Sequence, residues 1–463
     1  MELASNRVTQ ILIIGGGFGG VFTARNLEKI FPLKSEVKIT LVSRDNFFLM
    51  TPLLFEAMSG TIELGHCSVP IRDFLRQTFF IEACVSHMDL ENRTVFAQAP
   101  EGEVYSLKYD QLVLAMGAET NKDFIPGAEY AFTFKTLGDA MLVRNHIIER
   151  FERADVEKDP NHRRMLLTFV VIGGGLVGVE VFGELTAFVS SILRYYREIR
   201  PDELRFYLVH STDRILPEVD SELAEWVTRV LAARPGASIR TCSPVQRIES
   251  DRVFLPHEEL HAGTIILAAG IVPSPTVAKC PLQKTKHGQI AATNTLQAEG
   301  RSDIWVLGDC AAIPSPNGGY YPFLAQHAIR AAKRLALNIQ NALNGKRPSP
   351  FTYDTIGVMG SLGHFQGFGK VLGVRLHGFI AWWLRRTYYL SVMPRWSRRL
   401  QIVVDWTLSL FFRRDIVKVD LIHPSVAKPG TPPKVEEGQS TPLGAELTRP
   451  LGARDTQRLK ATD

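Results

Sequence analysis

The chain has 463 residues, a formal net charge of +5 and 45% hydrophobic residues. This length allows two or three domains with a sizeable core, and the composition is ordinary for a globular protein. No stretch approaches about 18 uninterrupted apolar residues, so we expect no membrane-spanning helix. We expect no signal peptide either, because the N-terminus runs directly into the strand predicted at Ile11. The five cysteines form no C-x-x-C pair, which predicts free thiols in a reducing compartment.

Residues 8–45 predict a strand, a glycine-rich turn, a helix and a second strand. Gly15, Gly17 and Gly20 form a G-x-G-x-x-G motif directly after the apolar residues 11–14. Glycine at these positions permits a tight turn, lets the backbone approach a pyrophosphate and packs the helix on the strand. The helix N-terminus then faces the anion. The second strand ends at Ser43 and Arg44.

The same signature recurs farther along the chain. Strand-like segments between residues 76 and 120 end at Gly117, and the Pro-Gly turn at 126–127 indicates a domain crossing. A helix is predicted over 135–158 and a strand over 165–172, which leads into Gly173, Gly175 and Gly178. Two such motifs, each after an apolar run, predict two dinucleotide sites and electron transfer between two nucleotide cofactors.

The second unit continues through a strand at 205–210 and ends near 264–273, which includes Gly270. A strand at 304–308 then ends on Asp309, and a helix is predicted from about Tyr321 to Leu343. The expected fold is α/β, with two Rossmann-like dinucleotide-binding domains, the second inserted in the first. We assign residues 1–125 and 274–350 to the first dinucleotide-binding domain, and 126–273 to the second.

Residues 351–422 form a distinct C-terminal module, in which aromatic and basic side chains alternate. We predict two short amphipathic helices that lie on a membrane surface, because Trp and Tyr suit the headgroup level and arginines pair with lipid phosphates. The basic residues of this stretch are Arg375, Arg385, Arg386, Arg395, Arg398, Arg399, Arg413, Arg414 and Lys418. A helical hairpin packed on the globule, or a homodimer interface, stays an alternative. Neither nucleic-acid binding nor a metal site is expected, and residues 423–463 are predicted to be disordered.

Over residues 8–420 the chain resembles the type II NADH:quinone oxidoreductases, which are single-subunit, non-pumping NADH dehydrogenases. The resemblance rests on the two glycine turns, residues 51–56, 268–270, 308–309 and 321–326, and the aromatic–basic C-terminal stretch. It implies FAD on the first turn and NADH or NADPH on the second, with a membrane quinone as electron acceptor. It also implies a peripheral enzyme of a respiratory chain, on the cytoplasmic face of the cell membrane.

The resemblance assigns roles to single residues. Gly117 would close a turn near the flavin, and Asp309 would hydrogen-bond the ribityl or phosphate region of FAD. Glu180 would lie near the nicotinamide, while Ala325 and Gln326 belong to a quinone-side motif. Two simpler interpretations stay open: Asp309 as a helix N-cap, and Glu180 as an acidic residue in a helix first turn.

Three positions depart from the family pattern. Ser43 stands where FAD-binding proteins prefer a carboxylate, although serine can still bind a ribose hydroxyl. His210 replaces the usual glutamate at the end of the strand at 205–210. With His210, Ser211 and Arg214 at this position, the sequence does not decide whether the nucleotide is NADH or NADPH. Arg330 replaces the second glutamine of the quinone-side motif and shares a helix face with Gln326. It would either donate a hydrogen bond to a quinone or close the pocket.

These departures keep one alternative function open, a redox sensor or an oxidoreductase with a non-quinone acceptor. Pyridine-nucleotide–disulfide reductases and sulfide:quinone oxidoreductases both need working cysteines, and no cysteine spacing here supports such chemistry.

Overall fold

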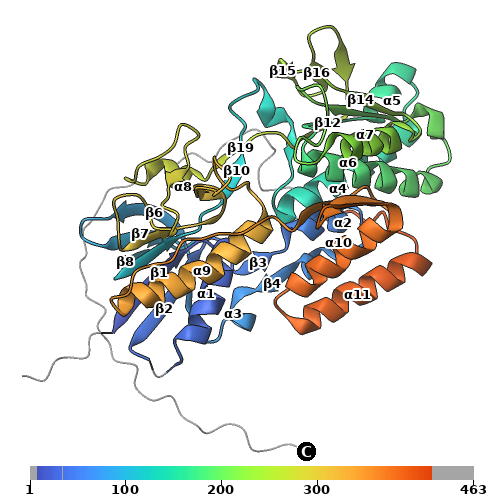
Figure 1. Cartoon of the computed structure of the whole chain (residues 1–463). Coiled ribbons are helices and arrows are strands. Elements are labelled where there is room, and N and C mark those ends of the chain that lie inside the picture. The colour runs from blue at the N-terminus through green and yellow to red at the C-terminus, as the bar shows by residue number, and fades with distance from the viewer. Residues whose placement is uncertain (1–7, 34, 420–463) are drawn as a thin grey trace, which may run out of the picture. The chain divides into compact units, whose positions relative to one another are not determined.

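The computed structural model describes residues 8–33 and 35–419, so the predicted tail at 423–463 lies outside the described residues. Its core contains two five-stranded sheets, shown in Figure 1. The first sheet is parallel and has the order β21-β9-β1-β2-β5. Its strands are β21 (Ile304–Val306), β9 (Gln111–Leu114), β1 (Thr9–Ile14), β2 (Val37–Ser43) and β5 (Phe79–Glu82).

The second sheet is also parallel and has the order β11-β18-β12-β13-β14. Its strands are β11 (Phe132–Thr133), β18 (Thr264–Leu267), β12 (Thr168–Ile172), β13 (Arg205–Val209) and β14 (Ala237–Arg240). The antiparallel pair of β10 (Ala118–Thr120) and β19 (Ile271–Pro273) carries the chain out of the first sheet and back. Because β21 rejoins the first sheet afterwards, the second unit is inserted in the first, which confirms the predicted fold class.

Apolar residues account for the central strands. Every residue of β12 is buried, and so are the last four of β1, as expected for strands covered on both faces. Helix α1 (Phe18–Ile30) follows β1 and packs beside α9 (Ala325–Leu343), as Figure 1 shows. Helix α6 (Leu176–Ile192) follows β12, and α4 (Leu137–Val156) precedes it with a capping box of Thr136 and Asp139.

The helix predicted from Tyr321 begins at Ala325 instead. Pro322 accounts for part of this difference, because it disfavours the helical region for Tyr321, the residue before it. Leu324, the N-cap of α9, is extended as well, with φ −123° and ψ 136°. The helix predicted over 135–158 is also shorter than expected and is followed by α5 (Pro160–Leu166), which starts at a proline after an Asp159 cap.

The C-terminal module is only partly helical. It begins with an antiparallel sheet of β23 (Gly357–Ser361), β24 (Gly367–Val371) and β25 (Val374–His377), which the sequence analysis did not predict. The two predicted helices follow as α10 (Gly378–Val392) and α11 (Trp396–Phe411). Four glycines in β23 and β24 hid the strand pattern, because glycine is depleted in ordinary strands.

The remaining elements are short. Two small sheets have three strands each: β6 (Cys84–Asp89), β7 (Thr94–Gln98) and β8 (Val104–Lys108) form one, and β15 (Arg247–Ile248), β16 (Arg252–Phe254) and β17 (Glu259–His261) form the other. Two further sheets are pairs of strands: β3 (Phe47–Leu49) with β4 (Ser68–Pro70), and β20 (Ile290–Ala291) with β22 (Ala311–Ala312). The other helices are α2 (Leu54–Met58), α3 (Ile71–Phe74), α7 (Ser221–Ala232) and α8 (Pro275–Lys279).

One segment of the described residues, Leu176–Tyr195, is long and apolar enough to cross a membrane by length and composition alone. It consists of α6 and the turn after it, and it is 67% buried within the protein. Such burial is the property of a core helix, so we do not assign a membrane span to this segment.

Candidate active site

The first glycine turn joins β1 to α1 and leaves space for a ligand. A Cβ on Gly15 would lie 2.2 Å from the carbonyl oxygen of Ala115, and one on Gly20 would lie 1.8 Å from that of Gly15, so both positions need glycine for packing. A Cβ on Gly17 would meet no protein atom within 4 Å, and α1 has no side-chain cap. The open backbone and uncapped helix amides fit the pyrophosphate of a dinucleotide.

Ser43 and Arg44, at the end of β2, and Gly117, after β9, lie in different surroundings near this turn. Ser43 is buried, and a Cβ on Gly16 would lie 2.5 Å from its Oγ, so the serine packs directly under the glycine turn. Arg44 is exposed and pairs with Glu119 at 3.1 Å. Gly117 has a φ of +66° and an open Cβ position, which leaves room for a cofactor at the end of β9. The roles assigned to these residues stay predictions.

Asp309 lies in a 3-10 turn, Gly308–Cys310, directly after β21. It lines a small cavity with Tyr321, Leu324 and His327. Burial raises the pKa of its carboxyl, while the charge of Lys135 opposes that shift. Within residues 8–33 and 35–419 no hydrogen bond reaches this carboxylate, so it can accept one from a cofactor hydroxyl. It does not cap α9, whose N-cap is Leu324 and has no side-chain cap.

The second glycine turn joins β12 to α6. Gly173 has a φ of +115°, and a Cβ on Gly178 would lie 1.8 Å from the carbonyl oxygen of Gly173. A Cβ on Gly175 would lie 3.0 Å from Glu218 Oε1, so an acidic side chain approaches the turn. Gly270 has a φ of +69°, and a Cβ there would lie 2.9 Å from the ring of Phe124.

His210, at the end of β13, lies under this second turn. The Gly174 N–H donates to His210 Nδ1 at 3.1 Å, and His210 Nε2 lies 2.9 Å from Thr212 Oγ1. Nδ1 is therefore unprotonated and Nε2 carries the proton. Burial lowers the pKa of this imidazole, which favours the same neutral form.

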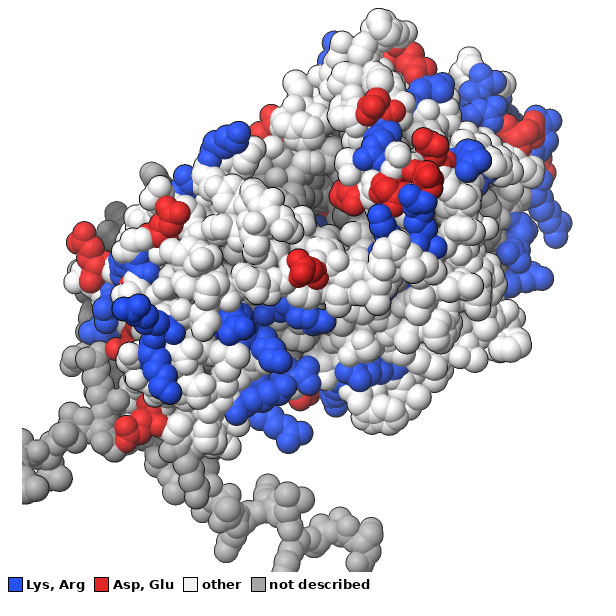
Figure 2. All heavy atoms as spheres, in the orientation of Figure 1, with Lys and Arg blue, Asp and Glu red and all other residues white. Residues whose placement is uncertain are grey.

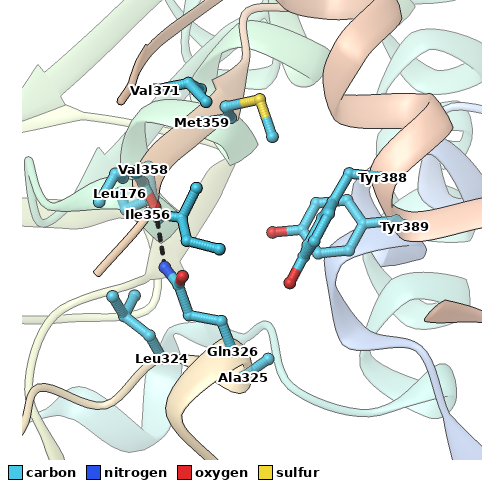
Figure 3. Close-up of a pocket in the computed structure, with 11 residues that line it drawn as sticks. Leu176, Leu324, Ala325, Gln326, Ile356, Val358, Met359, Val371, Tyr388 and Tyr389 are labelled. Carbon is cyan, nitrogen blue, oxygen red and sulfur yellow. Dashed lines mark hydrogen bonds between the residues drawn. The ribbon is translucent and has the colours of Figure 1, made fainter. Parts of the chain in front are cut away.

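A pocket opens between the N-terminus of α9 and the C-terminal module, shown in Figure 3. The Gln326 Nε2–H donates to the Gly357 carbonyl at 2.8 Å, and the hydroxyls of Tyr388 and Tyr389 point across the pocket toward Gln326. The lining residues are Leu176, Leu324, Ala325, Gln326, Ile356, Gly357, Val358, Met359, Val371, Tyr388 and Tyr389. This lining is mostly apolar, with a few polar groups that could orient a planar ligand.

Arg330 does not line this pocket but lies close to its edge. Its guanidinium carbon is 5.6 Å from the ring centre of Tyr353, and the Tyr353 hydroxyl donates to Gln326 Oε1 at 3.1 Å. The two side chains expected to share a helix face therefore contact the same tyrosine. Arg330 forms no ion pair within the described residues.

A buried ion-pair network lies behind the pocket. Glu56, at 1% exposure, accepts hydrogen bonds from Arg386 Nη2 at 2.7 Å and from Trp406 Nε1 at 2.8 Å. Arg385, also at 1% exposure, donates to Glu56 at 3.4 Å and pairs with Glu180 at 2.7 Å. The network thus joins α2, α6, α10 and α11.

Glu180 is buried in this network rather than placed on the pocket surface. Its Oε1 accepts from the Ser361 N–H at 2.8 Å as well as from Arg385. Burial raises its pKa to about 7, against the opposing charge of Arg385. Since Arg385 also lies 5.1 Å from the ring centre of Tyr389, Glu180 is linked to the pocket through these two side chains.

The network corrects the sequence analysis on Arg385 and Arg386. Both were expected to face lipid phosphates, but both are buried and pair with carboxylates, because an unpaired arginine in this core would be costly. Glu56 was not predicted as a site residue. The sequence did hold a sign of a buried ion pair, since two adjacent arginines in an apolar helix require buried acidic partners. It does not identify which acidic residues these partners are.

We predict that Glu56→Ala will lower the free energy of unfolding by about 3–5 kcal/mol, because it leaves two buried guanidinium groups without this partner. Asp73→Ala is the matched control. It breaks the exposed Arg395–Asp73 contact between the same parts of the chain and should cost about 0–1 kcal/mol. Denaturant unfolding measures both, and equal losses would contradict a structural role for the buried network.

The model of the family described as pyridine nucleotide-disulphide oxidoreductase matches residues 9–332. This match confirms the predicted α/β fold and the use of FAD and a nicotinamide nucleotide. The disulphide in the family's description has no counterpart here, since all five cysteines lie in the described part of the chain and are free there.

The relatives narrow the assignment. A probable NADH dehydrogenase from Dictyostelium discoideum is 30% identical over 417 residues, which cover 88% of this chain and 90% of the relative. A type II NADH:quinone oxidoreductase from Mycobacterium tuberculosis is 27% identical, with 88% and 89% covered. The structure of NDH2 from Plasmodium falciparum in complex with NADH shares the fold, with a TM-score of 0.82 at 20% identity, over 89% of this chain and all of that one. The chain therefore belongs to the pyridine nucleotide-disulphide oxidoreductase family and, within it, to the type II NADH:quinone oxidoreductases.

Proposed function

We propose that this oxidoreductase takes hydride from NAD(P)H onto FAD and passes two electrons to a quinone at a membrane surface, without pumping protons. The names of the relatives support the donor and the acceptor. The observation that carries the proposal is the apolar pocket between Ala325–Gln326 and Tyr388–Tyr389. It shares Leu324 with the cavity at Asp309, so it would lie next to a flavin held by the first glycine turn and Asp309.

The bound flavin supplies the redox chemistry, since it can accept a hydride and release electrons in turn. The chain's own residues bind and orient the reactants. The uncapped N-terminus of α9 presents partial positive charge at Ala325 and would stabilise negative charge on an adjacent ligand. Tyr388, Tyr389 and Gln326 supply hydrogen-bonding groups around an otherwise apolar space, which suits the carbonyl oxygens and ring of a quinone.

Reduction of a quinone to its quinol also consumes protons. Glu180, with a pKa of about 7, holds a proton over a useful part of the physiological range. It lies behind Tyr389, whose own pKa is raised to about 12 by burial, so the tyrosine stays protonated and able to donate a hydrogen bond. We infer that Glu180 acts electrostatically as a positioning residue. When it is protonated, the charge of Arg385 beside Tyr389 is left less compensated, and this positive charge favours electron transfer to a quinone in the pocket.

The outer face of the C-terminal helices supports attachment to a membrane. Exposed apolar side chains on α11 recur at helical spacing, at Trp396, Leu400, Val403, Val404, Leu408 and Phe411. Trp396, Phe411 and Phe412 are 72%, 78% and 69% exposed, and α10 adds Phe379, Ile380 and Trp383. An exposed stripe of this kind suits the headgroup–acyl boundary of a bilayer.

The opposite face of the same helices packs on the protein, with Ala381, Trp382 and Ile402 buried. Figure 2 shows the surface over α10 and α11 largely free of charged side chains, with Lys and Arg along its lower edge. Arg413 and Lys418 are exposed cations that follow α11 and can meet anionic headgroups. We propose that the enzyme acts on the cytoplasmic face of the cell membrane, as a peripheral component of a respiratory chain, as its family resemblance implies.

Filling the pocket should separate the two half-reactions. We predict that Met359→Trp will leave flavin reduction by NADH unchanged and slow flavin reoxidation by a water-soluble quinone by about tenfold or more, because the larger side chain occupies the quinone's space. Stopped-flow absorbance at the flavin band measures both rates. Leu372→Trp is the control, since Leu372 is 80% exposed in the neighbouring turn. Equal slowing of reduction would instead assign the pocket to the nicotinamide.

Removing the exposed stripe should release the protein from lipid. We predict that the triple variant Trp396→Ser, Phe411→Ser, Phe412→Ser will bind vesicles of anionic phospholipid about tenfold or more weakly in co-sedimentation, since it exposes less apolar area to the bilayer. Val156→Ser, at a 77% exposed site on α4, is the control. Unchanged vesicle binding would contradict the membrane proposal, and loss of a dimer in analytical ultracentrifugation would favour a homodimer interface.

A further inference from the structure

The segment at 211–220, between β13 and α7, folds back over the second glycine turn. The Leu216 N–H donates to the Gly174 carbonyl at 2.7 Å, and Leu216 is buried with a φ of +54°. A non-glycine residue in this left-handed region is unfavourable on its own, so the surrounding contacts hold it there. The result is a fixed loop that presents its next exposed residues beside the turn.

Glu218 is the side chain that this loop places at the nucleotide site. Its Oε1 accepts from the Leu176 N–H at 3.3 Å, at the start of α6, and lies 3.0 Å from where a Cβ on Gly175 would be. It is also close enough to act on His210, because its charge opposes the effect of burial on the His210 pKa. The carboxylate therefore lies between the glycine turn and the strand end.

This is the region where a dinucleotide-binding fold places the adenosine ribose, since the acidic residue that binds its 2′-hydroxyl normally comes from the strand end. Here the strand end cannot supply that group. His210 is neutral, and both of its ring nitrogens already contact Gly174 and Thr212. Arg214, the cation nearest in sequence, is engaged by the Val219 carbonyl, to which it donates at 3.1 Å.

We propose that Glu218 replaces the missing strand-end carboxylate, recognises the 2′-hydroxyl of NADH and rejects the 2′-phosphate of NADPH. This inference rests on the proposed function in one respect: the second glycine turn must bind a nicotinamide nucleotide. A carboxylate accepts a hydrogen bond from a ribose hydroxyl but repels a phosphate at the same position. Asp213 also acts electrostatically on His210 and adds a second negative charge on this side of the turn.

The proposal accounts for the long hydrogen bond to Leu176. Glu218 is exposed and forms no ion pair within the described residues, so its carboxylate can leave the α6 amide and turn to the ribose when a pyrophosphate takes the helix N-terminus. The carboxylate stays adjacent because the buried Leu216 anchors the loop.

Binding of ADP-ribose and 2′-phospho-ADP-ribose to the FAD-loaded protein tests the proposal by calorimetry. Neither ligand contains nicotinamide, so the result does not depend on hydride transfer. The wild type should prefer ADP-ribose, and Glu218→Gln should reduce that preference by about tenfold, with tighter binding of the phosphorylated ligand. Glu225→Gln removes the same charge from an exposed site on α7 and should leave the ratio unchanged.

Two results would overturn the assignment. A wild type that prefers the 2′-phosphorylated ligand would remove the basis for phosphate rejection. A Glu218→Gln variant that binds both ligands more tightly by the same factor would show that the carboxylate only competes with the pyrophosphate for the α6 amide. Failure of the proposed redox function would appear separately, as flavin that NADH does not bleach although ADP-ribose binds.

Discussion

The buried network of Glu56, Glu180, Arg385 and Arg386 is the constraint on which the rest of the structure depends. Two charged pairs in the protein interior are tolerated only if every partner is in place, since removal of one leaves an uncompensated buried charge. The carboxylates come from α2 and α6, and the arginines come from α10, so the network holds the C-terminal module against elements of both earlier regions. Trp406 adds α11 through its bond to Glu56.

Once α10 is fixed in this way, the positions of Tyr388 and Tyr389 follow, because they lie one turn beyond the two arginines on the same helix. These tyrosines form one wall of the pocket, and the start of α9 forms the other. The exposed stripe of α11 is fixed by the same packing, since α11 lies against α10 and the region of α2. A pocket for a lipophilic acceptor and a surface for lipid thus depend on one set of buried charges.

Much of the fold could be predicted from local patterns. The two glycine motifs gave the dinucleotide turns, since their spacing reflects contacts within a few residues, and the return strand ending at Asp309 indicated the insertion. The buried network could not be predicted, because Glu56 and Arg385 are 329 residues apart and nothing local links them. The same limit applies to Glu218, which reaches the second turn only through the irregular 211–220 loop. The three-stranded sheet at 357–377 was missed because its glycines weaken the strand signal.

The departures at Ser43, His210 and Arg330 have local explanations in the structure. Ser43 is small enough to pack under the first turn, His210 supports the backbone of the second, and Arg330 lies against Tyr353 at the pocket edge. None of these arrangements blocks the space left at Gly17 or the pocket between α9 and α10. The substitutions at Ser43, His210 and Arg330 are therefore compatible with the activity of a type II NADH:quinone oxidoreductase.

The most direct test of this account is the pH dependence of flavin reoxidation by a soluble quinone, measured by stopped flow for the wild type and Glu180→Gln. Glu180 is protonated below its pKa of about 7 and loses its proton above it, so the wild-type rate should fall as pH rises through 7. The amide is neutral at every pH, so Glu180→Gln should keep the low-pH rate across that window, with unchanged flavin content and unchanged reduction by NADH. An identical pH profile in both proteins would contradict the role of the buried network in quinone reduction.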